Sequence, residues 1–288
     1  MADATTRRTP ITTRLTYGWL GLVVVVAVVG PWLPLPDWNT VYDDALGVGP
    51  FTEGHLLGTD GNGYDLLLGL VSGARLSVFI AVVAVGLGGL IGGVLGIVAA
   101  YVRGRLDTTI TTSFNVILSV PNLVLALALV AVFATNVDVT ETIAPWRRVF
   151  TLIVSLTVVI IPILGRISRG SALAWTSREF VLAAQTMGMR TRDIIWRHIV
   201  PNVLPAMIAV AFLAVGVVII AEASLSILGV GVADGASWGG MIARGRNDLD
   251  YYPHVVLVPV VVLALTAICT NHVGDLIRAR LDRREARI

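Results

Sequence analysis

The stretch "REFVLAAQTMGMRTRDIIWRHIVP", residues 178–201, decides how the chain is organised. It is polar, carries arginine and has apolar residues at helical spacing, yet it stands between two apolar runs. A bilayer core about 30 Å thick is crossed by a helix of about 20 apolar residues, and both flanking runs are close to that length. With 56% hydrophobic and 14% charged residues, the chain is too apolar for an ordinary soluble domain. We therefore expect a multi-spanning membrane protein in which this stretch lies outside the bilayer.

Six apolar runs predict an all-α fold with six transmembrane helices. They cover about residues 15–32, 76–102, 110–134, 149–164, 204–228 and 255–270. The first run could be a signal peptide, but no small-residue cleavage site follows it, so a retained helix is favoured. The expected parts are an N-terminal tail, first helix and acidic external segment over residues 1–75, a five-helix core over residues 76–272 that includes the segment 176–201, and a basic tail over residues 273–288.

The placement of arginine orients these helices. All 21 basic residues are arginine. Sixteen of them fall in the N-terminal tail, the turn after the second run, the segment after the fourth run and the C-terminal tail, whereas five fall in the alternate segments. Because cytoplasmic segments of membrane proteins are enriched in basic residues, both termini and residues 178–201 are predicted to be cytoplasmic.

The absence of lysine limits the chemistry available to the chain. A phosphate-binding P-loop uses lysine to reach the β- and γ-phosphates, so any ATP that drives this protein must bind another chain. Neither H-E-x-x-H nor G-x-S-x-G occurs, which argues against an intramembrane enzyme. An ion-coupled carrier is an alternative, but such carriers place several charges inside the membrane and often contain inverted repeats. Here one acidic residue interrupts the apolar runs and no repeat is evident.

The second apolar run contains two rows of glycine. Gly88, Gly92 and Gly96 share one helix face, and Gly89 and Gly93 share another. Rows of small residues let helix backbones approach closely in membranes. We therefore expect this helix to pack tightly against its neighbours.

Residues 178–201 are expected to fold as two short helices separated by a bend. Thr176 and Glu179 match an S/T-x-x-E capping box that would start a helix near Ser177. Gly188 can end that helix, and Thr191 can cap the next one. The first helix would carry an apolar strip of Phe180, Ala183, Ala184 and Met187, and the second would place Ile194, Ile195, His198 and Ile199 along one side.

Two roles fit such a segment. Arginine-bearing amphipathic helices can lie on lipid headgroups, and they can also dock a cytoplasmic protein. Small alanines beside a bend permit close packing against protein, which favours docking.

A resemblance to a known family supports docking. Ala183 and Ala184, then Gly188 and, thirteen residues later, Pro201, resemble the EAA motif of ABC-importer permeases, E-A-A-x3-G-x9-I-x-L-P. The sequence departs from that motif at Leu182, His198 and Val200. "VLAA" and "RHIVPN" nevertheless resemble the form of the motif in the dipeptide/oligopeptide/nickel branch of the family.

Three further stretches resemble the same branch. They are "HLLGTDGNGYDLLLGLVSGARLSV" (55–78), "ILSVPNLVLALALV" (117–130) and "AEASLSILGVGVADGASWGGMI" (221–242). The single leading helix with its acidic external segment resembles the C-type subunit of this branch more than the B-type.

The resemblance implies the type I ABC-importer architecture in a prokaryotic cell membrane. It implies a homologous B-type permease, two ATPase subunits or domains that bind ATP and magnesium, and an extracytoplasmic substrate-binding protein. The implied substrates are di- and oligopeptides, with nickel chelates, glutathione or another small solute as alternatives. This chain would be non-catalytic, would hold no cofactor or metal and would bind no nucleic acid. The residues implied to couple the ATPase to the membrane helices are Glu179, Ala183, Ala184, Thr186, Met187, Gly188, Met189, Arg190 and Pro201.

Polar residues inside the apolar runs are candidates for the translocation pathway or gate. A charge in the bilayer needs a polar partner, so Glu222 either lines the pathway, with Ser224 nearby, or holds the turn that follows through hydrogen bonds. Asn115 and Asn122 flank Pro121 and either bridge packed helices or contact the substrate.

The external segment carries Asp60 and Asp65 among glycines, with His55 nearby. Their spacing lacks the last glutamate of an EF-hand. We expect a turn and helix-capping motif in which His55 forms a hydrogen bond.

Overall fold

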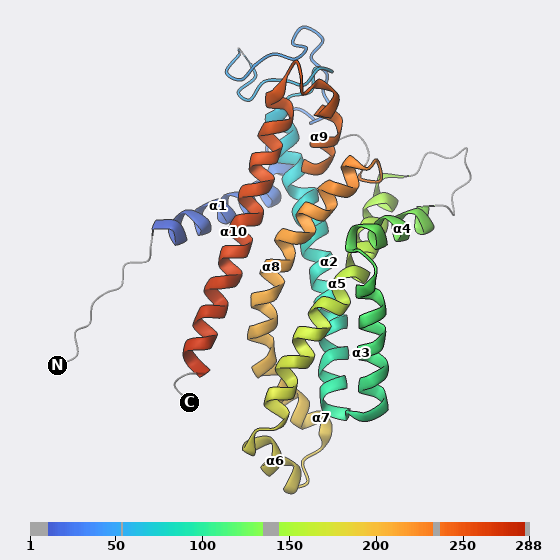
Figure 1. The fold of residues 1–288 in the computed structure, drawn as a ribbon. Coiled ribbons are helices and arrows are strands. Elements are labelled where there is room, and N and C mark those ends of the chain that lie inside the picture. The colour runs from blue at the N-terminus through green and yellow to red at the C-terminus, as the bar shows by residue number, and fades with distance from the viewer. Residues whose placement is uncertain (1–10, 53, 135–143, 233–236, 286–288) are drawn as a thin grey trace, which may run out of the picture.

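The computed structural model describes residues 11–52, 54–134, 144–232 and 237–285, and its architecture is helical (Figure 1). That part of the chain contains isolated β-bridges but no strand. Residues 1–10 and 286–288 of the two predicted tails lie outside the described residues. The elements are α1 (Ile11–Val29), η1 (Gly30–Trp32), α2 (Leu66–Val102), α3 (Gly104–Ser119), α4 (Asn122–Ala134), α5 (Pro145–Thr176), α6 (Glu179–Thr186), α7 (Thr191–Ile194), the π-helical turn η2 (Ile195–Ile199), α8 (Val200–Ile227), α9 (Trp238–Gly245), η4 (Arg246–Asp248) and α10 (Pro253–Glu285).

Long apolar helices confirm the all-α membrane fold. Among the described residues, five helical stretches are long and apolar enough to cross a bilayer: Ile11–Trp32, Leu66–Val102, Pro145–Thr176, Thr191–Ile227 and Pro253–Leu281. A sixth span exists only if α3 and α4 are counted as one, and these two helices are bent by 93°. The third predicted span, about residues 110–134, is therefore interrupted by a sharp bend.

A proline explains the break between α3 and α4. Val120 ends α3 with an extended backbone (φ −88°, ψ 132°). The ring of Pro121 disfavours the helical conformation in the residue before it, so the chain turns there and restarts as α4. The sequence contained this signal, but the apolar run continues across it.

Helix α2 begins earlier than the apolar run at residue 76 indicated. The Asp65 carboxylate accepts hydrogen bonds from the backbone N–H groups of Leu67 and Leu68. This satisfies donors that have no partner at a helix start, so the helix begins at Leu66. The resulting 37-residue helix extends from the membrane bundle to the loops of residues 33–65.

Helix α5 is likewise longer than the apolar run 149–164 and continues to Thr176. Its Arg169 contacts Asp107 of α3, with Nε 2.5 Å from Oδ1 and an Nη 2.7 Å from Oδ2. Bidentate arginine–carboxylate pairs are the stronger ion pairs in proteins. This contact fixes the N-terminal end of α3 to α5.

The glycine rows of α2 pack as expected. A Cβ on Gly92 or Gly96 would overlap backbone carbonyl oxygens of α5, and Figure 1 shows the two helices side by side. Gly93 of the second row faces the Met207 side chain of α8. The glycine rows therefore bring the α2 backbone close to the backbone of α5 and to a side chain of α8.

Replacing Gly92 by alanine is expected to loosen the α2–α5 contact. The added methyl group would meet the Ile161 carbonyl, and overpacking of this kind costs about 1–3 kcal/mol. Gly86→Ala is a matched control, because nothing lies within 4 Å of a Cβ at that position. Thermal unfolding in lipid nanodiscs should show a lower midpoint for Gly92→Ala only. Equal midpoints for both variants would contradict the packing described here.

The remaining elements lie at opposite ends of the bundle (Figure 1). Helix α8 packs against α10, α2 and α5. Helices α6 and α7 lie at one end, whereas α9 and the loops of residues 33–65 lie at the other. A long helix, α8, connects the two regions.

Candidate functional site

The segment 178–201 forms a helix, a bend and the start of a long helix. Helix α6 is followed by the bend at Gly188, and α7, η2 and α8 then form one helical stretch from Thr191 to Ile227. The expected second helix of the segment is therefore the first part of the membrane helix itself. Residues 191–199 are thus continuous with α8.

The start of α6 differs from the expected capping box. Thr176 belongs to the last turn of α5, where its hydroxyl donates to the Leu173 carbonyl. Arg178, with an extended backbone (φ −76°, ψ 145°), occupies the cap position without a side-chain hydrogen bond. The capping box failed because α5 continues through Thr176, and a helical residue cannot adopt the extended backbone of an N-cap.

The expected cap of the next helix is also wrong. Thr191 is the first residue of α7, and Arg190 precedes it as an extended cap residue without a side-chain hydrogen bond. The first backbone N–H groups of α6 and α7 therefore do not donate to a capping side chain.

Gly188 ends α6 as predicted. Its φ of +76° lies in the left-handed region that favours glycine. The N–H of Gly188 donates to the Gln185 carbonyl at 3.0 Å, and the N–H of Met189 donates to the Ala184 carbonyl at 3.1 Å. These two bonds form a Schellman motif, which fixes the direction of the chain after the helix.

The two faces of α6 differ from the expected strip. Val181 and Ala184 are buried, and they belong to one apolar cluster with Ile194 and Ile199 of the following helix. Phe180 and Met187, expected in the same strip as Ala184, are exposed instead. The buried face of α6 therefore belongs to Val181 and Ala184, whereas the half-exposed Phe180 places its ring 5.9 Å from the ring of His198 in η2.

The outward face of α6 is an apolar patch at the tip of the molecule. Met187 is 76% exposed and Leu182 is 49% exposed, and Ala183 and Thr186 lie between them, also exposed. We call Leu182, Ala183, Thr186 and Met187 the tip patch. Large apolar side chains in an exposed group indicate an interaction surface.

The pathway candidates do not come together. Asn115 is exposed on α3, where its side-chain oxygen accepts a hydrogen bond from Arg166 of α5 at 2.5 Å. Asn122 is exposed at the start of α4, beyond the bend. The hydroxyl of Ser224 donates to the Ile220 carbonyl of its own helix. A pathway role for these residues stays a prediction.

Glu222 lies two residues before Ser224, near the C-terminal end of α8, and is completely buried. Its carboxylate accepts hydrogen bonds from the hydroxyls of Ser77, Ser226 and Ser237. Ser237 precedes α9, so one of these hydrogen bonds joins Glu222 to the segment after its helix. Of the two roles expected of Glu222, lining the pathway stays a prediction. Sequence reasoning did not find these three partners, because two of them lie in other elements.

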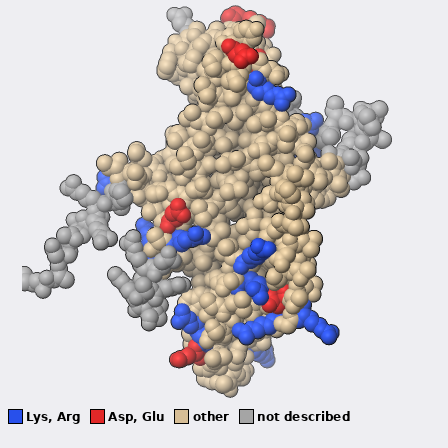
Figure 2. Space-filling model, in the orientation of Figure 1, with Lys and Arg blue, Asp and Glu red and all other residues tan. Residues whose placement is uncertain are grey.

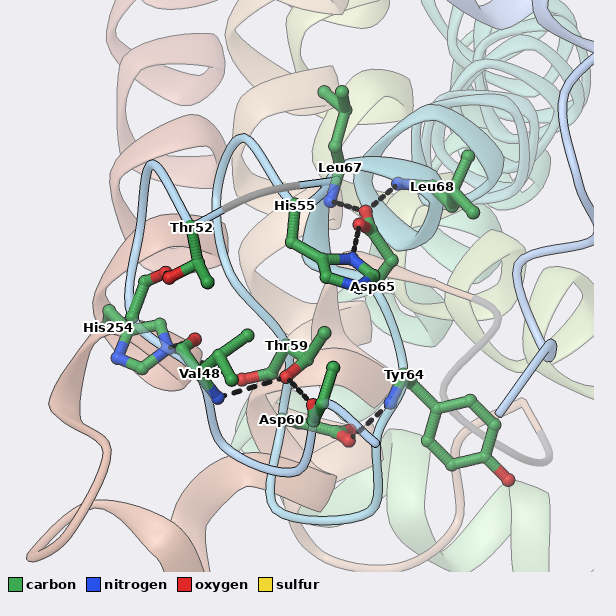
Figure 3. Close-up of polar contacts among 12 residues, drawn as sticks. Val48, Thr52, His55, Thr59, Asp60, Tyr64, Asp65, Leu67, Leu68 and His254 are labelled. Carbon is green, nitrogen blue, oxygen red and sulfur yellow. Dashed lines mark hydrogen bonds and ion pairs between the residues drawn. The ribbon is translucent and has the colours of Figure 1, made fainter. Parts of the chain in front are cut away.

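The external aspartates form turns and a helix cap (Figure 3). One oxygen of Asp60 accepts from the N–H groups of Asn62 and Tyr64, while Asp65 caps α2 and contacts Nδ1 of His55 at 2.7 Å. Within the residues that the structure describes, no three His, Cys, Asp or Glu side chains are grouped to hold a metal ion. His55 thus has the hydrogen-bonding role expected of it.

Residues 92–287 match the family described as binding-protein-dependent transport system inner membrane component. The chain belongs to this family. The permease is 33% identical over 263 residues to the oligopeptide transport system permease protein OppC of Bacillus subtilis (strain 168), which covers 91% of this chain and 82% of that protein. It has the same identity, over 91% of this chain and 84% of the relative, to the probable D,D-dipeptide transport system permease protein DdpC of Escherichia coli (strain K12). These relatives confirm the resemblance to C-type peptide permeases.

Two further comparisons extend this result. The permease is 30% identical to the glutathione transport system permease protein GsiD of Pectobacterium atrosepticum, over 91% of this chain and 83% of the relative. Among solved structures, it resembles an inward-facing conformation of the MetNI methionine ABC transporter with a TM-score of 0.59 at 20% identity, covering 73% of this chain and 94% of that one. At this identity the likeness concerns the fold, which is that of an ABC-transporter permease.

Proposed function

We propose that the permease is one of two membrane subunits of an ATP-driven importer for di- and oligopeptides. The tip patch on α6, joined through Gly188 to the start of α8, is the observation that carries this proposal. An exposed apolar surface directly attached to a membrane helix is what a permease needs to receive motion from a soluble ATPase. The residues of the segment that would couple the two are those of the EAA-like motif, Glu179 to Arg190 and Pro201.

Transport would follow from two conformations of the permease. Closure of the ATPases around ATP would displace α6, and the continuous stretch from Thr191 to Ile227 would carry that displacement across the membrane. Such coupling requires that ATP and substrate favour the two conformations differently. The buried contacts of Val181 and Ala184 would make α6 move with α7 as one body.

The distribution of charge supports the proposed orientation. Figure 2 shows a group of arginines at the end that carries α6 and α7, and acidic residues at the opposite end. Basic residues favour the cytoplasmic side, so the tip patch and both termini would be cytoplasmic and the loops of residues 33–65 would be external. The proposed partners are a B-type permease, two ATPase subunits or domains that bind ATP and magnesium, and an extracytoplasmic substrate-binding protein.

Glutathione is a second candidate substrate, since the permease is 30% identical to a glutathione transport system permease. A nickel chelate is an alternative within the same branch. An ion-coupled carrier is disfavoured, because Glu222 is the one buried carboxylate within an apolar stretch among the described residues, and its oxygens accept hydrogen bonds from serines.

Gentle purification from the native membrane, followed by reconstitution, tests the proposed function. We expect a second permease and an ATPase to purify with this chain, and we expect ATP-dependent uptake of a tripeptide once the binding protein is added. Uptake driven by an ion gradient without ATP, by a chain that purifies alone, would overturn the importer. Uptake of reduced glutathione in place of other tripeptides would select the second substrate.

A further inference from the structure

The outer end of the permease contains a continuous set of polar contacts from α8 to the external loops. We name the external loops, residues 33–52 and 54–65, the outer cap. We propose that Glu222 is a positioning residue that ties α8 to α9 and, through an Arg244–Asp60 ion pair, to the outer cap. Movement delivered to α8 at the ATPase end then reaches the external face. This inference rests on the proposed function.

The first link is the buried carboxylate of Glu222. Its Oε1 accepts from Ser237 at 2.7 Å and from Ser226 at 3.0 Å, and its Oε2 accepts from Ser77 at 3.4 Å. The three serines belong to the turn before α9, to α8 itself and to α2. One side chain of α8 is therefore bonded within its own helix, to the start of α9 and to α2, which lies 145 residues away in the sequence.

The second link fixes the first turn of α9. The hydroxyl of Ser237 accepts from the Gly240 N–H at 3.0 Å and caps α9, while the hydroxyl of Ser77 accepts from the Trp238 N–H at 3.1 Å. Trp238 is buried, and its indole N–H donates to the Leu70 carbonyl at 3.0 Å. The same serines thus bind the carboxylate and the backbone of α9.

Close packing leaves α9 no room to slide over α8. A Cβ on Gly239 would overlap the backbone of Ala223, the residue next to Glu222. Polar contacts and backbone contact therefore act at one place. Helix α9 is expected to follow any shift of the outer end of α8.

The third link connects α9 to the outer cap. Arg244, in the last turn of α9, has its Nε 3.2 Å from Oδ2 of the buried Asp60. Its guanidinium also lies over the ring of Tyr64, with 4.3 Å to the centroid. The other Asp60 oxygen accepts hydrogen bonds from the backbone N–H groups of Asn62 and Tyr64 in the cap. A displacement of Arg244 would therefore move this part of the cap together with Asp60.

A further contact keeps the cap close to this ion pair. Nε2 of His254, at the start of α10, lies 3.1 Å from the Val48 carbonyl and 3.3 Å from the Thr59 carbonyl (Figure 3). The cap is therefore held by α9 and α10 together, whereas covalently it leads into α2. Because Trp238 of α9 is bonded to Ser77 and Leu70 of α2, α9 and α2 move together, and their shift relative to α10 must change the position or shape of the cap.

The helical stretch that contains α8 is long enough to connect the ATPase end of the permease with the outer end. Glu222 and Thr191 lie on one helical stretch, and at 1.5 Å per residue they are about 45 Å apart. A buried carboxylate among hydroxyls is costly unless its hydrogen bonds are complete. The bond to Ser237 alone would suffice to hold the turn after α8. The additional bond to Ser77 ties α8 to α2, and ties of this kind are what transmission of movement needs.

The test measures the cap in the intact importer. Spin labels at Phe51→Cys in the cap and Trp146→Cys on α5, in a Cys269→Ala background, report the distance between cap and bundle without nucleotide and in an ATP-trapped state. We expect that distance to change on trapping, and we expect Glu222→Ala and Asp60→Asn each to abolish the change. In both variants, the number of ATP molecules hydrolysed per substrate imported should rise about fivefold or more above wild type. A factor of about five is the lower end of the usual range of coupling between sites.

Several controls separate transmission from folding. Asp60→Asn keeps the side chain's shape and its backbone contacts, so it tests the link even if Glu222→Ala fails to assemble. Because both variants break one chain of contacts, the double variant should show no further loss. Ser113→Ala, which removes a hydroxyl bonded only to its own helix, should behave as wild type.

The outcomes distinguish this link from the proposed function. A cap distance that still changes in Asp60→Asn and Glu222→Ala overturns the link, and so does an unchanged distance in a wild-type importer that transports with ATP. A wild-type complex that neither hydrolyses ATP nor changes on trapping overturns the proposed function together with the link.

Discussion

A Gly188→Val permease is expected to assemble normally and to import almost no substrate while its ATPase still turns over. Valine is β-branched and strongly disfavours a φ of +76°. Strain of this kind costs about 1–3 kcal/mol. The chain would relieve it by giving up the Schellman motif, and the tip patch would then point in a different direction from the start of α8. Simultaneous measurement of ATP hydrolysis and peptide uptake in proteoliposomes checks this result.

Gly188→Asn provides the matched control. Asparagine tolerates the left-handed region better than other non-glycine residues, and nothing lies within 4 Å of a Cβ at this position. Uptake should therefore be largely retained in Gly188→Asn. Equal loss in both variants would show that the side chain blocks a contact and that backbone conformation is not the cause.

An Ala184→Asp permease is expected to lose coupling by a different route. Ala184 is 2% exposed within the cluster that joins α6 to Ile194 and Ile199. An unpaired carboxylate cannot be buried there without a cost of several kcal/mol, so α6 should detach from α7. Limited proteolysis should cut at residues 178–190 in the variant, while the unfolding midpoint of the membrane helices stays near wild type.

Ala184→Ser serves as its control, because a hydroxyl can bond to a helix carbonyl one turn earlier and should leave α6 in place. Wild-type uptake and unchanged proteolysis in Ala184→Asp would contradict the buried position of this residue. The EAA-like motif implied that Ala184 is one of the residues that couple the ATPase to the membrane helices. Its burial indicates that it acts from within the segment, whereas the tip patch supplies the outer surface.

Features that depend on local backbone geometry were predictable from the sequence. Gly188 has the left-handed conformation that its position after an apolar helix indicated, and the glycine row of α2 meets the backbone of α5. In both cases only glycine, which has no Cβ, fits the backbone conformation or the close contact without a steric clash. Five of the six predicted spans followed from run length, because about 20 apolar residues suffice for a helix that crosses a bilayer.

Features that depend on distant residues were not predictable. Hydropathy alone could not reveal that Pro121 bends one span by 93°, because the residues on both sides are equally apolar. Helix α9 is eight residues long and rich in glycine, so it has no clear helical pattern. The partners of Glu222 lie up to 145 residues away, and only the packed fold brings them together.

The tip patch on α6 is the surface that we propose binds an ATPase. A photo-reactive amino acid at position 187, where the methionine is 76% exposed, tests it in intact membranes, with the same probe at position 51 of the outer cap as the comparison. Mass spectrometry should identify a nucleotide-binding ATPase subunit cross-linked at position 187 and not at position 51. Cross-links from position 187 to lipid alone, with the ATPase attached elsewhere, would contradict the claim.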